Sequence, residues 1–258
     1  MELEGRVAAI TGGTRGIGRA IAEAFVEEGA KVVINGRSAD KGAQALEEMD
    51  AGDAVTFVQG DVTVREDCEK VVTSAVETYG KIDIIVPNAG GGGDAAPVAE
   101  MTDESMDFAL KWNFWHTFWC MRKSLEYMIP QQSGRIINIS SIEGKAGKPG
   151  VSHYVANKHA INGLTKSCAQ EVGTLGITVN ALCPGAIETD VMMEQGPQAA
   201  EAMGLTYQGL LDWFASESAV KRLNDVEDVA LVATLLASDA GAGITGSLIS
   251  IDGGTLPY

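Results

Sequence analysis

Seven short runs of apolar residues recur along the chain, and longer segments with helical periodicity separate them. Nearly every position in these runs is apolar, which is typical of strands that helices cover on both faces of a sheet. Strands that alternate with helices are joined by crossover connections and therefore lie parallel. The pattern predicts an α/β fold with one doubly wound, seven-stranded parallel sheet and helices on both faces. The runs lie at 6–11, 31–35, 55–59, 82–86, 135–140, 177–182 and 247–251.

Helical patterns and capping residues fill the intervals between the runs. Thr102, Asp103 and Glu104 form an N-terminal capping sequence, while Gly29 and Gly80 are placed to end two helices. No linker, repeat or charge block divides the 258 residues, so we expect a single domain over 1–258. Helices are expected at 17–29, 39–49, 65–79, 102–130, 151–175 and 225–238.

Residues 188–224 break this rhythm, because they contain helical pieces but no strand. The segment follows the carboxyl end of a strand, which is where ligands bind in open α/β sheets. We therefore interpret 188–224 as a substrate lid. A peripheral helix pair that only covers the core is the alternative.

Composition excludes several classes of partner. The net charge is −16 and the sequence pI about 4.5, whereas nucleic acids and anionic membranes need a positive surface. The 4 cysteines are far apart and only 3 histidines accompany them, so no metal site is expected. No apolar run is long enough to span a bilayer, and the start MELEGRVAAI does not look like a secretory signal. We expect a cytoplasmic protein.

A glycine-rich turn, TGGTRGIG at 11–18, lies between the first strand and the first helix. Gly12, Gly16 and Gly18 leave room for a tight turn, for close approach of the backbone to a pyrophosphate and for helix–strand packing. The spacing differs from G-x-G-x-x-G, and the Gly-Lys-Ser/Thr of a phosphate loop is missing. The turn predicts dinucleotide binding.

This turn and the motifs that follow it resemble the short-chain dehydrogenase/reductase family, in the family's order and over nearly the whole chain. The resemblance implies a Rossmann-type dinucleotide-binding catalytic domain, a nicotinamide cofactor and a catalytic tetrad. The matching residues beyond the turn are Asp61-Val62, Asn88-Ala89-Gly90, Asn113, Ser141, Tyr154 with Lys158, and Pro184-Gly185 with Thr189.

The resemblance also implies which residues contact the cofactor. One departure is Pro87, where the family often has asparagine, and four glycines at 90–93 are expected to loosen the loop that follows. The implied cofactor-binding residues are Gly12, Thr14, Arg15, Gly16, Ile17, Gly18, Arg37, Ser38, Asp61, Val62, Asn88, Ala89, Gly90, Tyr154, Lys158, Pro184, Gly185, Ile187 and Thr189.

Tyr154 and Lys158 are one helical turn apart, so they share a face. An ammonium and an oxidised nicotinamide both favour phenolate, and we expect them to bring the pKa of Tyr154 from about 10 toward neutrality. By resemblance, Ser141 rather than Ser140 binds the substrate oxygen. The resemblance also implies that Asn113 interrupts its helix and holds a water that relays protons to Lys158.

Residues after the second strand indicate which nicotinamide cofactor is used. An NAD site usually has an acid there to hold the ribose 2′-hydroxyl, but this chain has Gly36 followed by Arg37. Arg37 and Arg15 are suited to a 2′-phosphate. We therefore expect NADP(H).

The substrate is constrained mainly by charge. No Lys or Arg occurs from Ser167 to Val220, so a lid there is negative and disfavours acyl carrier protein and coenzyme A. A small to medium, largely apolar ketone, aldehyde or alcohol fits better. A 3-oxoacyl thioester reductase and a catalytically silent dinucleotide-binding regulator are the alternatives. Five side chains either line the substrate pocket or pack in the core: Met192, Met193, Tyr207, Trp213 and Phe214.

The remaining aromatic residues have weaker interpretations. His153 is expected to pack beside Tyr154 rather than contact substrate. The family resemblance implies a homotetramer, and three tryptophans on the long helix add some support: Trp112, Trp115 and Trp119.

Overall fold

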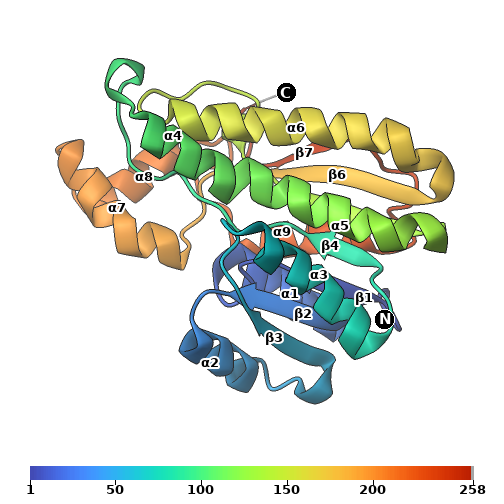
Figure 1. Ribbon diagram of the computed structural model, residues 1–258. Helices are drawn as coiled ribbons and strands as arrows, with labels where there is room; N and C mark the ends of the chain where they lie inside the picture. Colours follow the sequence, from blue (N-terminus) through green and yellow to red (C-terminus); the bar gives the residue numbers. More distant parts are fainter. Residues whose placement is uncertain (257–258) are drawn as a thin grey trace.

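The expected seven-stranded parallel sheet is confirmed in a computed structural model, which describes residues 1–256 (Figure 1). The strand order is β3-β2-β1-β4-β5-β6-β7, and every neighbouring pair is parallel. The strands are β1 (Val7–Ile10), β2 (Lys31–Gly36), β3 (Val55–Gln59), β4 (Ile84–Val86), β5 (Gly134–Ile139), β6 (Ile177–Pro184) and β7 (Leu248–Ile251).

Helices cover both faces of this sheet and create two apolar cores. Strand β1 supplies both: Ala8 and Ile10 belong to one core, while Val7 and Ala9 belong to the other. Because successive side chains of a strand point to opposite faces, a strand buried on both sides must be apolar throughout. One core contains residues of α1 (Gly16–Glu27), α2 (Ala39–Met49) and α9 (Val226–Ala237); the other contains residues of α3 (Arg65–Tyr79), α5 (His116–Gln131) and α6 (Ser152–Val172).

The strand order reverses between β1 and β4. From β1 the chain adds β2 and β3 on one side, and it then returns to place β4 to β7 on the other. Such a reversal leaves a crevice at the carboxyl ends of the two central strands. The glycine turn at 11–18 follows β1 and Asn88 follows β4, so both lie at this crevice.

The prediction of one continuous helix over 102–130 is wrong, because the segment is divided into three parts. Thr102 caps α4 (Asp103–Ala109), a π-helical segment η3 (Leu110–Trp115) follows, and only then does α5 begin. Asn113 lies in this π-helical segment and donates from Nδ2 to the carbonyl of Ala109 at 3.1 Å. Segments of this kind are frequent at functional sites, and the expected interruption at Asn113 is present.

Residues 188–224 form α7 (Asp190–Ala202) and α8 (Tyr207–Glu217), and an isolated parallel bridge joins Ile187 to Asn224. Figure 1 shows α7 and α8 beyond one end of the sheet, separate from the helices that cover its faces. No helix among residues 1–256 is long and apolar enough to cross a membrane. The short helices are η1 (Gly52–Ala54), η2 (Val98–Glu100), η4 (Ile142–Gly144) and η5 (Gly173–Leu175), the last ending the helix expected at 151–175.

Candidate active site

The glycine turn brings backbone close to backbone at the crevice. A Cβ on Gly18 would lie 2.4 Å from Asn88 Nδ2 and 2.5 Å from the carbonyl oxygen of Gly12, so no side chain fits there. Gly12 has φ +63° and the same neighbour, with Asn88 Nδ2 3.0 Å from a Cβ. The amides of the first turn of α1 carry a partial positive charge and stand beside this turn. The arrangement fits a dinucleotide pyrophosphate.

Asn88 braces this turn through its side chain. Its Nδ2 donates to the carbonyl of Thr11 at 2.9 Å, and its backbone amide donates to Thr11 Oγ1 at 3.0 Å. Thr11 Oγ1 also accepts from the amide of Ala89 at 3.2 Å and contacts His116 Nε2 at 2.8 Å. Thr11 therefore ties the ends of β1 and β4 together. Burial, followed by the positive charge of Lys158, lowers the pKa of His116 to about 3, which keeps its ring neutral.

The first two glycines of the run after Asn88 pack closely against the long helix. Asn113 Oδ1 accepts from the amide of Gly91 at 3.2 Å, and Asn113 Nδ2 donates to the carbonyl of Gly91 at 3.2 Å. A Cβ on Gly91 would lie 2.4 Å from Trp112 Cη2. A Cβ on Gly90 would lie 2.6 Å from Asn113 Oδ1 and 3.7 Å from Lys158 Nζ. These glycines let large side chains pack directly on the backbone, and they bring Asn113 and Lys158 to the same place.

Tyr154 and Lys158 face one another on α6, as their spacing predicts. Lys158 Nζ lies 5.4 Å from the centroid of the Tyr154 ring and donates to the carbonyl of Ile139 at 2.8 Å. The adjacent residues Ser140 and Ser141 make different contacts. Ser140 Oγ donates to the carbonyl of Lys158 at 3.3 Å and so supports the helix, whereas Ser141 lies close enough to Tyr154 to influence its pKa.

The electrostatics of Tyr154 differ from the expectation that Lys158 lowers its pKa. Burial raises the pKa of Tyr154 above its usual value of 10, the negative charge of Glu143 raises it further, and the hydrogen bond with Ser141 opposes both. Burial also lowers the pKa of Lys158 to about 8. The protein's own groups therefore hold Tyr154 in its protonated, proton-donating form.

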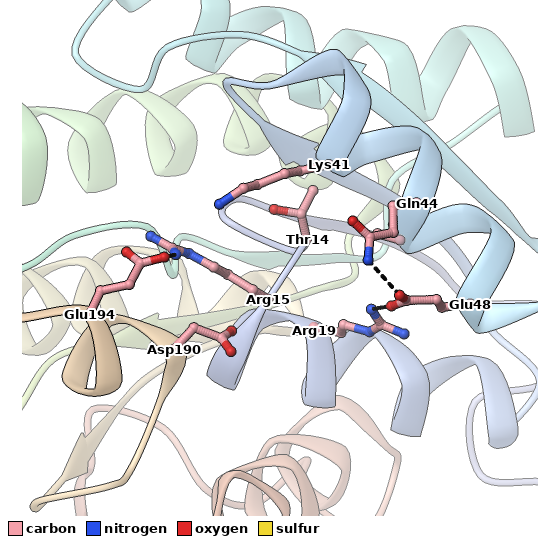
Figure 2. Close-up of a pocket in the computed structure, with 9 residues that line it drawn as sticks. Thr14, Arg15, Arg19, Lys41, Gln44, Glu48, Asp190 and Glu194 are labelled. Atoms are coloured by element: carbon pink, nitrogen blue, oxygen red, sulfur yellow. Dashed lines mark hydrogen bonds and ion pairs between the residues drawn. The ribbon is translucent and has the colours of Figure 1, made fainter.

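A hollow of about 240 Å³ lies between α1, α2 and α7 (Figure 2). Arg15 Nη1 is 2.7 Å from Glu194 Oε1 across it. Lys41 extends its amine into the same hollow, whereas Arg37 is exposed and does not line it. The lining residues are Thr14, Arg15, Arg19, Lys41, Gln44, Ala45, Glu48, Asp190 and Glu194.

Thr14 packs against Gly36 at the end of β2. A Cβ on Gly36 would lie 2.9 Å from Thr14 Cγ2, so a larger residue there would require Thr14 to shift. Ser38 caps α2 by accepting from the amide of Lys41 at 3.2 Å. Of the two basic residues predicted from sequence, Arg15 lines the hollow and Arg37 is exposed at the end of β2; Lys41 lines the hollow as well.

The other expected cofactor residues are distributed around the turn. Thr189 caps α7 by accepting from the amide of Met192 at 3.3 Å, and its Cγ2 would lie 3.7 Å from a Cβ on Gly16. Asp61 instead turns back on its own loop, where Oδ1 accepts from the amide and hydroxyl of Thr63 at 2.9 and 2.8 Å.

The rest of that set is mostly packed against protein. Val62 and Ile187 are buried, Ile17 packs on the core, Pro184 ends β6, and a Cβ on Gly185 would lie 2.9 Å from Asp252 Cα. Among residues 1–256 no group of three or more His, Cys, Asp or Glu is placed to hold a metal ion.

Comparison with known proteins identifies the family. A family model described as short chain dehydrogenase matches residues 6–200. The chain belongs to this family. The dehydrogenase is 34% identical to 3beta-hydroxysteroid dehydrogenase of Mediterraneibacter gnavus, with 98% of this chain and 95% of the relative covered. It is 37% identical to 3-oxoacyl-[acyl-carrier-protein] reductase FabG of Thermotoga maritima, with 98% and 99% covered.

A solved structure agrees with these relatives. A variant of actinorhodin polyketide ketoreductase, crystallised with NADPH, superposes with a TM-score of 0.93 and 31% identity, covering 98% of both chains. The dehydrogenase is thus a short-chain oxidoreductase that interconverts CH–OH and C=O groups of a small molecule with a nicotinamide cofactor.

Four residues of the dehydrogenase site carried no clear signal in the sequence. Thr11 and His116 contact each other although they are far apart in the sequence. Lys41 lines the hollow because α2 lies beside α1. Glu143 was the one that proximity could have suggested, since it is two residues from Ser141.

The side chains of 188–224 that were expected to line the substrate pocket or to pack in the core lie in different surroundings. Met193 is half exposed, and a Cβ on Gly196 would lie 2.5 Å from Tyr207 Cε2, so Tyr207 packs between α7 and α8. Trp213 and Phe214 both approach Lys148. His153 is buried, and neither ring nitrogen has a hydrogen-bond partner within residues 1–256.

Proposed function

We propose that the protein is an NADP(H)-dependent oxidoreductase that interconverts a ketone or aldehyde with the corresponding alcohol on a small to medium, largely apolar substrate, with Tyr154 as general acid/base. The observation that carries this proposal is the convergence of Ser141, Tyr154 and Lys158, with Lys158 beside Gly90 in the loop after β4. Each group has a distinct chemical task there.

Tyr154 handles the proton. When bound, the nicotinamide supplies or accepts the hydride. In reduction, the hydroxyl of Tyr154 donates its proton to the substrate oxygen as the C=O π bond breaks, and in oxidation the phenolate takes that proton back. Ser141 hydrogen-bonds the same oxygen and orients it. Because burial raises the pKa of Tyr154, its hydroxyl is protonated near neutral pH and can act as the donor in reduction.

Lys158 and Asn113 support this exchange. The ammonium of Lys158 would hold the ribose hydroxyls of the cofactor and stabilise negative charge on Tyr154. Asn113 lies beside the same backbone, at Gly90 and Gly91, where a relayed water would reach Lys158.

The choice of NADP(H) rests on the hollow between α1, α2 and α7. Arg15 and Lys41 line it, exposed Arg37 follows Gly36 at the end of β2, and Gly36 supplies no acid to hold a 2′-hydroxyl. A 2′-phosphate is recognised by such cations. The relative solved with NADPH agrees with this assignment.

The substrate assignment rests on residues 188–224, which we propose act as a lid. The segment is acidic and carries no Lys or Arg before Lys221, which disfavours phosphate-bearing carriers. The FabG relatives favour a 3-oxoacyl thioester reductase as the second candidate.

We further propose a cytoplasmic homotetramer of single-domain chains. Trp115 is 41% exposed and stacks on Trp119 with ring centroids 5.9 Å apart, which leaves an aromatic surface on the long helix. Trp112 is partly buried and packs on Gly91. Sedimentation velocity would test the assembly.

A panel of carbonyl compounds with NADPH or NADH tests the function directly. We expect reduction of neutral ketones, a higher kcat/KM with NADPH than with NADH, and weak activity on 3-oxoacyl thioesters. A clear preference for NADH would contradict the cofactor assignment, and a preference for carrier-bound thioesters would favour the second candidate.

A further inference from the structure

Glu143 is a carboxylate that the proposed reaction does not use, although it contacts a residue that the reaction does use. The hydroxyl of Ser141 donates to Glu143 Oε2, and the amide of Glu143 donates back to Ser141 Oγ at 3.2 Å. Burial is the larger influence on Tyr154 and Lys158, but the charge of Glu143 raises the pKa of both. Its side chain is only 16% exposed. Glu143 therefore faces the reacting groups.

The hydroxyl of Ser141 cannot donate to Glu143 and to a substrate oxygen at the same time. A serine hydroxyl has a single proton, and a carboxylate only accepts. When Ser141 turns its proton to the oxygen of a substrate carbonyl, Glu143 loses that donor. A largely buried carboxylate left short of donors is costly, so the site requires a replacement.

The remaining partner of Glu143 does not supply this donor. Lys148 Nζ is 3.4 Å from Glu143 Oε1, the other oxygen of the carboxylate. Lys148 is itself held against α8, with its Nζ 4.8 Å from the centroid of the Phe214 ring and 5.9 Å from that of Trp213. It balances the charge of Glu143 and links it to the proposed lid, while Oε2 stays directed at Ser141.

We propose that Glu143 determines specificity by accepting a hydrogen bond from a substrate hydroxyl on the carbon next to the reacting carbon. The substrate class is then an α-hydroxy ketone in reduction and a vicinal diol in oxidation, which refines the proposed function and rests on it. Ser141 and Glu143 are in hydrogen-bond contact, so the substrate oxygens that they bind sit on adjacent carbons. A hydroxyl fits better than an ammonium because Lys148 already balances the carboxylate.

The test compares two ketones of equal size, 2-hydroxyacetophenone and propiophenone, in which a hydroxyl replaces a methyl. The measured quantity is the ratio of their kcat/KM values in wild type, Glu143→Leu and Glu143→Gln. We expect the ratio to fall about tenfold to a hundredfold in Glu143→Leu, as for loss of a charged hydrogen bond, and less in Glu143→Gln, which retains an acceptor. Differences in intrinsic reactivity between the ketones cancel, because each variant meets the same pair.

Glu171→Gln is the matched control, since it removes one carboxylate from the exposed face of α6. It should leave the ratio unchanged. Melting curves and NADP⁺ titrations of each variant establish that fold and nucleotide binding persist. A ratio unaffected by Glu143→Leu would overturn the inference, and so would a preference for 2-aminoacetophenone that depends on Glu143.

A binding readout separates this inference from the proposed function. Calorimetry in the presence of NADP⁺ compares 1-phenyl-1,2-ethanediol with 1-phenyl-1-propanol, and Glu143→Leu should abolish the preference for the diol. If wild type reduces neither ketone but still prefers the diol through Glu143, the proposed function is wrong and the binding site stands. If both ketones are reduced with the same ratio in every variant, only the role of Glu143 is wrong.

Discussion

The crevice has two regions that are built differently. The nucleotide side is the glycine turn with Asn88, where the backbone is closely packed, and the substrate side is the cluster of Ser141, Glu143 and Tyr154, which carries functional groups. On the nucleotide side, Gly12 and Gly18 lie so close to Asn88 that a single added carbon has no room. On the substrate side, Ser141, Glu143 and Tyr154 each contribute a hydrogen bond or a charge to a buried cluster. The first region should therefore be damaged by added atoms, and the second by the removal of functional groups.

Removal of one oxygen from the substrate side should have the largest effect. Tyr154→Phe deletes the group that exchanges the proton, and we expect kcat to fall about a thousandfold or more, within the range for general acid–base catalysis. The fold and the Kd for NADPH should stay near wild type, as measured by circular dichroism and fluorescence titration. Near-normal turnover would remove Tyr154 from the mechanism.

The second-largest effect is expected when one methyl group is added to the nucleotide side. Gly18→Ala places a Cβ 2.4 Å from Asn88 Nδ2, so the turn or the brace must move. We expect about 1–3 kcal/mol of destabilisation and weaker binding of both NADPH and NADH. Gly163→Ala is a matched control, because a Cβ there meets nothing within 4 Å. Equal Kd values for the two variants would contradict the proposed contrast.

The buried amine of Lys158 should give the substrate side a characteristic pH dependence. Burial lowers its pKa from 10.5 to about 8, so between these values the unfolded chain holds a proton that the folded chain has released. The free energy of unfolding should then rise with pH across this window, by at most about 3 kcal/mol. Urea unfolding of wild type and Lys158→Met at several pH values would show a positive slope in wild type that is reduced in the variant. Parallel slopes would assign the pH dependence to other groups.

The smallest effect is expected where α7 meets the nucleotide side. Glu194 pairs with Arg15 at 2.7 Å, and both side chains are partly exposed, at 54% and 33%. A pair of this kind contributes about 0.2–1 kcal/mol, so Glu194→Gln should tighten NADPH binding up to about fivefold by freeing Arg15. NADH binding should not change. An equal effect on both nucleotides would mean that Arg15 does not meet the 2′-phosphate.

Much of the architecture follows from local sequence. Apolar runs predict buried parallel strands because both faces of each strand must be covered, and the glycine turn after β1 follows from its strand–turn–helix setting. The spacing of Tyr154 and Lys158 predicts that they share a helix face, which the structure shows. The continuous helix expected at 102–130 failed because the π-helical segment around Asn113 depends on contacts with Gly91 from another part of the chain.

Sequence by itself determined the strand pattern, the glycine turn and the Tyr154–Lys158 pair, since each depends on residues close together in the chain. Tertiary structure decided the rest. Arg15 and Glu194 are 179 positions apart in the sequence but in contact in the structure, and no local sequence pattern predicts such a contact. The raised pKa of Tyr154 likewise comes first from burial, which exists only once the helices have closed over the sheet.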